Sequence, residues 1–187
     1  MTERPIPPRP GAGAPAARLA EILRVDHAGE LGAVHIYRGQ RAVLEGRPGR
    51  ERISGQLEDM ESHEARHLAR FERMLTESGV RPTVLAPVWR AAGFALGAVS
   101  ALIGEKSAHA CTEAVEDVIE AHYGAQIEEL ADRAPALSAE LAQFRQEELA
   151  HRDQAREEGA REAPGYGLMA AAIRLGCRAA IKISEKL

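Results

Sequence analysis

The sequence has few aromatic residues, two cysteines and no apolar run of membrane-spanning length, and each shortage excludes a class of structure. Aromatic residues make up 4% of the chain, and no segment alternates β-branched side chains, which indicates helices rather than strands. Cys111 and Cys177 lie far apart and outside any Cys-x-x-Cys pattern. This excludes a disulfide scaffold or thiolate metal site and indicates a reducing, cytoplasmic compartment. No Gly-rich dinucleotide loop, P-loop or Ser-His-Asp order is present.

The overall charge and length favour one domain without a nucleic-acid partner. The net charge is −4 with 28% charged residues, so the chain has no general attraction to nucleic acid or anionic lipid. The 187 residues with 45% hydrophobic content suffice for one core, which we expect over residues 18–187. Residues 1–17 are Pro-rich and lack the apolar stretch of a secretory signal and the Ser-rich, amphipathic character of a transit peptide. We expect a disordered tail there.

Four segments carry apolar residues three and four positions apart, the spacing of one buried helical face: 19–44, 53–74, 109–130 and 137–155. They predict an all-α four-helix bundle made of two hairpins. The first hairpin turns at Gly46–Gly49 and brings Glu30 level with Glu64. The second closes less neatly, because the turn near Pro135 lies nearer Glu148 than Glu116. We therefore expect the third helix to end early, near Glu128.

A carboxylate interrupts the apolar face of each helix. Glu30 and Glu64 are 34 residues apart, and Glu116 and Glu148 are 32 apart, so the chain resembles a loose tandem repeat of one hairpin. An unpaired buried carboxylate costs several kcal/mol, so four of them need a compensating cation. The pattern predicts a metal cluster in the middle of the bundle.

Two Glu-x-x-His pairs, Glu64 with His67 and Glu148 with His151, put a carboxylate and an imidazole on one helical face. In so Glu-rich a chain such pairs also arise by chance, but both lie inside apolar faces and each follows a helix with a buried Glu. This is the ligand arrangement of di-iron and di-manganese carboxylate proteins. The predicted ligands, which suit Fe or Mn better than Zn, are Glu30, Glu64, His67, Glu116, Glu148 and His151. The alternative is a set of surface glutamates.

The remaining histidines and two tyrosines have structural interpretations. We favour a supporting or surface role over metal ligation for His27, His35, His63, His109 and His122. Tyr37 and Tyr123 lie two turns beyond Glu30 and Glu116 on the same faces. Either tyrosine could donate a hydrogen bond or serve as a redox relay, but core packing is the favoured role.

Two further segments have membrane-like patterns. Between Pro82 and Gly104 the only charge is Arg90, and about 14 apolar or small residues follow it, fewer than the ~20 that span a bilayer. We interpret this segment as a long apolar crossover between the hairpins. The last segment, Leu168–Leu187, carries a cation every fourth residue opposite an Ile and Leu face, which predicts an extra amphipathic helix in a membrane interface. Ordinary core and an ordinary solvated face are the alternatives.

Six sequence motifs, in order, resemble one known family, demethoxyubiquinone hydroxylase of ubiquinone biosynthesis. They are Arg24–Glu30 (RVDHAGE), Glu64–His67 (EARH), Arg81–Leu85 (RPTVL), Gly93–Gly97 (GFALG), Ala110–Thr112 (ACT) and Glu147–His151 (EELAH). The resemblance covers about residues 19–187. It implies a ferritin-like fold and a di-iron monooxygenase that uses O2 to hydroxylate the ring of 2-polyprenyl-3-methyl-6-methoxy-1,4-benzoquinol (demethoxyubiquinol). It also implies the same six metal ligands, for two Fe ions per chain.

The resemblance further implies a setting and partners. We expect peripheral attachment to membrane lipid on the cytoplasmic face of a bacterial inner membrane, a lipid-binding protein of the ubiquinone pathway as partner, and NADH as a candidate electron source. A homo-oligomer is left open. Lys182 stands where some family members carry a Tyr, so a role for that position is in doubt. The competing functions are a soluble ferritin-like ferroxidase or peroxidase and a non-catalytic quinone-binding scaffold.

Overall fold

The computed structural model describes residues 15–187, and this part of the chain is helical, with no strand. Its elements are α1 (Pro15–Leu44), α2 (Glu51–Glu77), α3 (Ala86–Ile103), α4 (Glu105–Leu130), α5 (Pro135–Glu157), the short 3₁₀ helix η1 (Ala160–Glu162) and α6 (Tyr166–Ser184). The all-α prediction is confirmed. The predicted tail lies outside the described residues up to position 14, and its boundary is wrong at the other end, because residues 15–17 begin α1.

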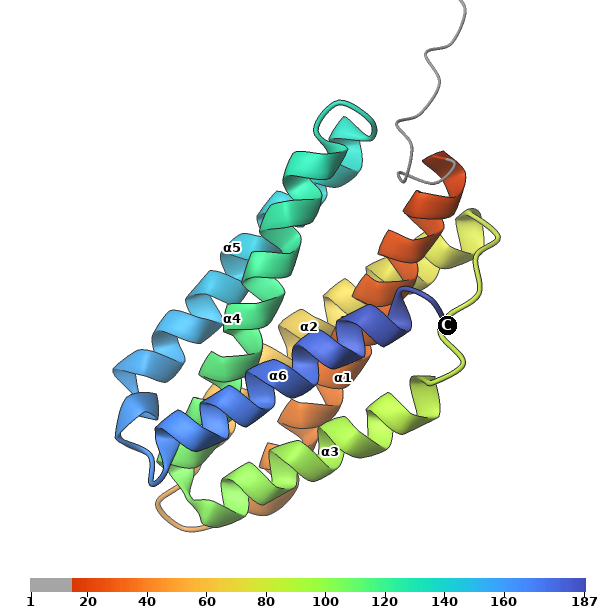
Figure 1. The fold of residues 1–187 in the computed structure, drawn as a ribbon. Coiled ribbons are helices and arrows are strands. Elements are labelled where there is room, and N and C mark those ends of the chain that lie inside the picture. Colours follow the sequence, from red (N-terminus) through yellow and green to blue (C-terminus); the bar gives the residue numbers. More distant parts are fainter. Residues whose placement is uncertain (1–14) are drawn as a thin grey trace, which may run out of the picture.

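Helices α1, α2, α4 and α5 form the four-helix bundle, and α3 carries the chain back along it so that α2 and α4 run in the same direction (Figure 1). One long crossover between two hairpins is the connectivity of ferritin-like folds, as predicted. Helix α6 lies beside α1 and α4, and with α3 it covers one side of the bundle (Figure 1).

The two hairpins have matching dimensions. Glu30 lies 14 residues before the end of α1, and Glu64 lies 13 residues after the start of α2. Glu116 and Glu148 have the same offsets in α4 and α5. The expected early end near Glu128 is therefore wrong: α4 continues to Leu130, and the short turn to Pro135 is equally far from both glutamates. The expectation from the sequence placed the turn at Pro135, whereas the turn begins where α4 ends, at Leu130.

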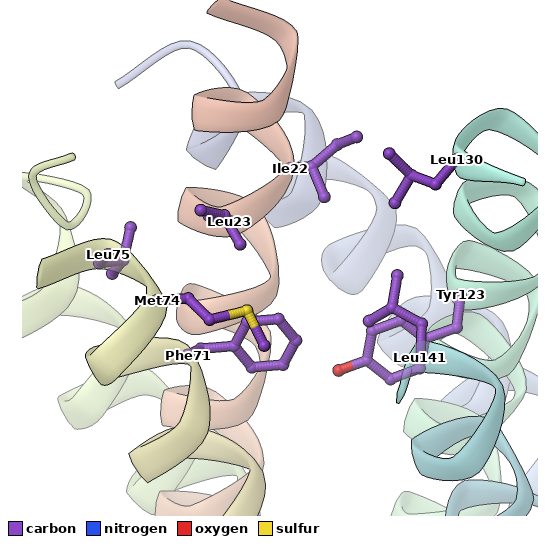
Figure 2. Close-up of a cluster of buried hydrophobic side chains, with 8 residues drawn as sticks. All are labelled: Ile22, Leu23, Phe71, Met74, Leu75, Tyr123, Leu130 and Leu141. Atoms are coloured by element: carbon purple, nitrogen blue, oxygen red, sulfur yellow. The ribbon is translucent and has the colours of Figure 1, made fainter. Parts of the chain in front are cut away.

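Two apolar clusters close the interior of the bundle at its two ends. Figure 2 shows the first cluster, with side chains from all four bundle helices: Ile22, Leu23, Phe71, Met74, Leu75, Tyr123, Leu130 and Leu141. The second consists of Tyr37, Leu44, Ile53, Leu57, Met60, Ala101 and Ala108. In α1, α2 and α4 the predicted ligands lie between these clusters, so apolar packing separates them from water at both ends.

Helix α3 packs closely on α1 because glycines occupy the contact. A side chain at Gly39 or Gly97 would collide with the backbone of the opposite helix. The Gly93 and Gly97 spacing thus serves helix packing in this fold. By length and composition, α3 is the one helix in the described part of the chain that could cross a membrane, and its 18 residues exceed the 14 counted in the sequence. The estimate counted residues after Arg90, whereas the helix begins at Ala86.

Helix α6 is amphipathic as predicted, but its apolar and cationic side chains do not lie on the two opposite faces that the sequence predicted. Ile173 is buried against α4, whereas Leu168 and Leu175 are exposed on the same side as Lys182. The cations therefore do not form a ridge opposite a single Ile and Leu face. Arg174 is paired with Asp117 and so helps to fix α6 on α4.

Candidate metal centre

The fold brings all six predicted ligands together in the middle of the bundle. Their side chains are at most a few per cent exposed. Their ligand atoms form two groups, each with its atoms within 4.8 Å of one another: Glu30, Glu64, His67 and Glu148, and Glu64, Glu116, Glu148 and His151. Glu64 and Glu148 belong to both groups, so their two-oxygen carboxylates are suited to bridge two ions. The alternative of surface glutamates is excluded for these residues.

The two imidazoles point the same ring nitrogen inward. His67 Nδ1 lies 3.2 Å from Glu148 Oε1 and 3.5 Å from Glu30 Oε2. His151 Nδ1 lies 3.1 Å from Glu64 Oε1 and 3.5 Å from Glu148 Oε2. Each nitrogen thus adjoins carboxylates from another helix, and the centre is assembled from all four helices of the bundle.

Burial and mutual repulsion oppose ionisation of these carboxylates in the metal-free protein. Desolvation, together with the neighbouring carboxylates, raises the pKa of Glu64 and Glu116 well above the ordinary value. Burial also raises the pKa of Glu148. For His67, burial favours the neutral form, but the nearby carboxylates of Glu148 and Glu30 outweigh it and raise its pKa to about 10. Buried acids with such opposed preferences are typical of functional sites.

The polar atoms of the centre fit divalent ions. Eight buried atoms have no aligned hydrogen-bond partner: both carboxylate oxygens of Glu64 and of Glu148, one oxygen each of Glu30 and Glu116, and Nδ1 of His67 and His151. Buried polar atoms without partners are rare in native proteins and each needs an explanation. Four carboxylates and two imidazoles offer the oxygen and nitrogen donors that iron and manganese accept, and two divalent ions would balance four negative charges.

Each tyrosine donates a hydrogen bond to a carboxylate of the opposite hairpin. The Tyr37 hydroxyl donates to Glu116 Oε1 at 2.6 Å, and the Tyr123 hydroxyl donates to Glu30 Oε1. The favoured role of core packing is confirmed, because both rings pack in the apolar clusters, and the hydrogen-bonding role that was left open holds as well. The spacing of seven residues from each Glu was the signal for this role.

Two residues that the sequence interpretation missed as partners of the ligands meet the outer edges of the imidazoles. Glu147 Oε2 lies 3.1 Å from His67 Nε2, and His63 Nδ1 lies 3.0 Å from His151 Nε2, with the two rings of that pair stacked. Such partners fix the orientation of a ligand histidine. His63 had been assigned a supporting or surface role, which this contact confirms. For Glu147, the only indication of this role in the sequence was its position directly before Glu148.

The other histidines lie outside the two groups of four. His35 Nδ1 donates to the Leu31 carbonyl at 2.8 Å, which is a structural role. His122 Nε2 lies 3.2 Å from buried Asp26, to which Gln126 also donates. His27 and His109 are buried, so a surface position is wrong for both.

An apolar cavity of about 480 Å³ lies beside the centre, between α1, α3, α4 and α6. Gly29 and Gly32 of α1 leave open space along its wall. A smaller pocket shares Ala33, Ile36 and Val115 with the cavity, and Tyr37, Thr112 and Glu116 complete its lining. The cavity therefore adjoins the Glu116 side of the centre. Cavities of this size commonly hold small organic molecules.

The fold and the site define a ferritin-like helical bundle with a carboxylate–histidine ligand set suited to two metal ions. Residues 17–184 match the family model described as ubiquinone biosynthesis protein COQ7, and the chain belongs to that family.

Curated relatives are similar over nearly the whole chain. The 3-demethoxyubiquinol 3-hydroxylase of Rhodospirillum rubrum is 48% identical over 95% of this chain and 82% of its own. The human NADPH-dependent 3-demethoxyubiquinone 3-hydroxylase, mitochondrial, is 45% identical over 91% of this chain and 79% of its own. The 5-demethoxyubiquinone hydroxylase, mitochondrial, of Saccharomyces cerevisiae is 38% identical over 93% and 80%.

Proposed function

We propose that this protein is a monooxygenase that adds a hydroxyl group to the ring of demethoxyubiquinol in ubiquinone biosynthesis. The observation that carries the proposal is the apolar cavity that adjoins Glu116 of the six-ligand centre. Relatives that match this chain over about 80% of their own length are named for this hydroxylation. A quinol ring with an isoprenoid tail is the kind of ligand that such a cavity accepts.

In this proposal the six side chains hold two iron ions. Glu64 and Glu148 would bridge, while Glu30 with His67 and Glu116 with His151 would complete the two positions. Reduced iron supplies the activation of O2 that an organic residue cannot provide. The chain's own part is to hold the carboxylates in position. The Tyr37 and Tyr123 hydroxyls do this by hydrogen bonding, and the two apolar clusters exclude water.

The cavity would orient the substrate. Its wall is almost entirely apolar, so it would bind the ring and first isoprene units through burial and not through charge. The smaller pocket next to Glu116 and Thr112 has no room for a water molecule, so the ring edge would have to displace its lining side chains to reach the centre. The Tyr37 hydroxyl is already used by Glu116, so it holds the ligand and not the substrate.

Exposed apolar side chains support peripheral attachment to a lipid bilayer. In the described part of the chain, every large exposed hydrophobic residue lies on α3, α6 or the segments next to them: Val84, Val88, Phe94, Val99, Leu102, Ile103, Leu168, Leu175, Ile183 and Leu187. Such concentration on one side is typical of an interaction surface. Because α3 and α6 also border the cavity, a tail could pass from lipid into it. We propose that this surface binds the cytoplasmic face of a bacterial inner membrane or a lipid-binding protein of the ubiquinone pathway.

Liposome co-sedimentation tests the membrane part. Phe94→Glu with Leu175→Glu places charges on the exposed side and should abolish binding, whereas Gln143→Glu on exposed α5 should leave it unchanged. Equal binding of both variants would contradict the assignment.

The electron donor is proposed to be a nicotinamide nucleotide. The rat, mouse and human relatives are named NADPH-dependent, so NADPH joins NADH as a candidate. Reduction of the iron-loaded protein by each nucleotide, with and without quinone, would distinguish them. Reduction by neither nucleotide would exclude this donor class.

The central experiment combines product analysis with a cavity-filling variant. Iron is loaded anaerobically, demethoxyubiquinol and O2 are added, and a gain of one ring oxygen is measured by mass spectrometry. Gly32→Leu should extend into the cavity that Gly32 lines and reduce hydroxylation at least about tenfold with iron content unchanged, because a Cβ at position 32 meets no atom within 4 Å. Gly55→Leu is the matched control, because Gly55 is exposed on α2 and a Cβ there also meets no atom within 4 Å.

Two outcomes would favour the other functions. Oxidation of iron with the quinol untouched would indicate a ferroxidase or peroxidase. Metal-free protein that still binds quinone, combined with iron-loaded protein that forms no product, would indicate a scaffold.

A further inference from the structure

A second cluster of metal-ligating side chains lies where the start of α4, the end of α5 and the start of α2 meet. Glu105 is the first residue of α4, His109 follows one turn later, and Glu158 comes directly after α5. One ligand atom from each of these three residues lies within 4.8 Å of the others. The cluster shares no residue with the six-ligand centre.

His109 is the unusual member of this cluster. Its side chain is 1% exposed, and its Nε2 has no hydrogen-bond partner in the described part of the chain. Burial lowers the pKa of His109, so its imidazole is neutral and retains a free lone pair. A buried ring nitrogen without a partner requires either an ordered water or a bound ion.

A guanidinium now compensates the two carboxylates. Arg52 pairs with both Glu105 and Glu158, Arg50 pairs with Glu105, and Gln56 donates to Glu158 at 2.7 Å. Arg52 is about half exposed, so its side chain can turn into solvent at little cost. The carboxylates are thus occupied by a replaceable cation, and the imidazole remains unused.

We infer that Glu105, His109 and Glu158 form a separate binding site for a divalent transition-metal ion, with Zn²⁺ as the best match. Two carboxylates and one neutral imidazole carry two negative charges and supply the three protein ligands of an open zinc site, in which water takes the fourth position. Tetrahedral ligand atoms ~2.1 Å from one ion lie ~3.4 Å apart, so the side chains of the cluster, whose ligand atoms lie within 4.8 Å of one another, must move closer together around the ion.

The position gives this site a distinct relation to the bundle. His109 and Glu116 lie seven residues apart on one face of α4, about 10 Å along the helix axis. An ion held by α4 and α5 would join the ends of the second hairpin and stabilise the folded state by mass action. The inference does not depend on the proposed hydroxylation.

Competition between the metal and Arg52 makes the inference testable in two directions. Removing a ligand should weaken Zn²⁺ binding, whereas removing the competing guanidinium should strengthen it. If these side chains only form ion pairs within the protein, neither substitution should change Zn²⁺ binding.

Zn²⁺ is titrated into iron-loaded, full-length protein, and zinc and iron are counted per chain by mass spectrometry of the elements. We expect one zinc ion per chain with no loss of iron. His109→Ala should weaken zinc binding by at least about tenfold, and Arg52→Gln should strengthen it about twofold to fivefold. His35→Ala, a half-buried histidine of α1, is the control and should leave zinc binding unchanged.

Three results would overturn the inference. They are no zinc bound beyond the iron content, zinc that only replaces iron, or zinc affinity that is equal in His109→Ala and His35→Ala. Should His109→Ala fail to fold, Glu158→Gln at the partly exposed end of α5 carries the same expectation, opposite in sign to Arg52→Gln. A water molecule on His109 would leave zinc binding absent.

Discussion

The two hairpins carry the same predicted ligands at the same places but differ in the residue that precedes each Glu-x-x-His pair. That residue is His63 in α2 and Glu147 in α5. Each reaches across to the other hairpin, so Glu147 meets the outer nitrogen of His67 and His63 meets that of His151. The inner ligands are therefore symmetric, and their supports are not.

This difference indicates that the two metal positions are unequal. A carboxylate behind a ligand imidazole raises its basicity and fixes its orientation, which a neutral imidazole does less effectively. The metal-free protein is already asymmetric: burial lowers the pKa of His151, whereas contacts with carboxylates raise that of His67. We expect the ion held by Glu30 and His67 to bind first.

The largest effect is expected when the carboxylate that belongs to a single metal position is removed from one hairpin or the other. Glu30→Ala and Glu116→Ala should each lower iron content and reduce hydroxylation at least about 100-fold, because each removes a ligand from one position. Iron per chain and product are measured together, with Glu140→Gln in the ion pair with Arg70 as control. A Glu116→Ala protein with full iron and full activity would show that the site assignment is wrong.

Changing the outer partners should have a smaller effect and should distinguish the halves. Glu147→Gln should weaken binding of the first ion about 10- to 100-fold, since it removes the carboxylate behind His67. His63→Gln should affect only the second ion, and His63→Glu should make the two affinities more alike. Stepwise Fe²⁺ titration under anaerobic conditions separates the two events. Identical titration curves for Glu147→Gln and His63→Gln would contradict the inequality.

Substitution of Tyr37 and Tyr123 tests whether the two hydrogen bonds to the glutamates stabilise the protein equally. Tyr37→Phe and Tyr123→Phe each remove a hydrogen bond to a buried carboxylate, with an expected loss of about 1–3 kcal/mol in iron-loaded stability. The two losses should be nearly equal. Thermal unfolding of the loaded variants measures them, and a large effect in only one would show that the tyrosines have different roles.

The pH dependence of the metal-free protein should have the smallest effect. Glu64 and Glu116 have raised pKa values, so the stability from their protonated forms is lost as pH rises through those values. His67 acts in the same direction, because its stabilising charge is complete below pH 6.5 and lost as pH rises through its pKa of about 10. The unfolding temperature should fall by a few degrees from pH 6 to pH 10, at about 2–4 °C per kcal/mol.

Glu30 does not alter this pH prediction. Its lowered pKa changes stability only below its ordinary value of 4.5, outside the tested range. Calorimetry should find a flatter profile after iron loading, since metal holds the carboxylates ionised. A metal-free profile that rises with pH would contradict the shifts.

Much of the fold and the inner centre could be predicted from the sequence. A buried helical face repeats every three to four residues, so the intrusion of Glu30, Glu64, Glu116 and Glu148 into apolar faces was visible without coordinates. Hairpin lengths then put the four glutamates near one level. Helix ends were less certain, as the end of α4 shows, because turn residues mark a boundary only approximately.

Sequence alone thus determined the helices, the two hairpins and the six buried side chains predicted as ligands, because these follow from periodicity along a single chain direction. Tertiary structure decided what crosses between helices: the tyrosine hydrogen bonds, the contrast of Glu147 with His63, the apolar cavity, and the cluster around His109. The contacts of the two tyrosines, Glu147 and His63 join residues 79 to 93 positions apart, and the cavity is lined by residues from Val25 to Ser184. Their pairing depends on how the helices are rotated and packed against one another, which local spacing does not encode.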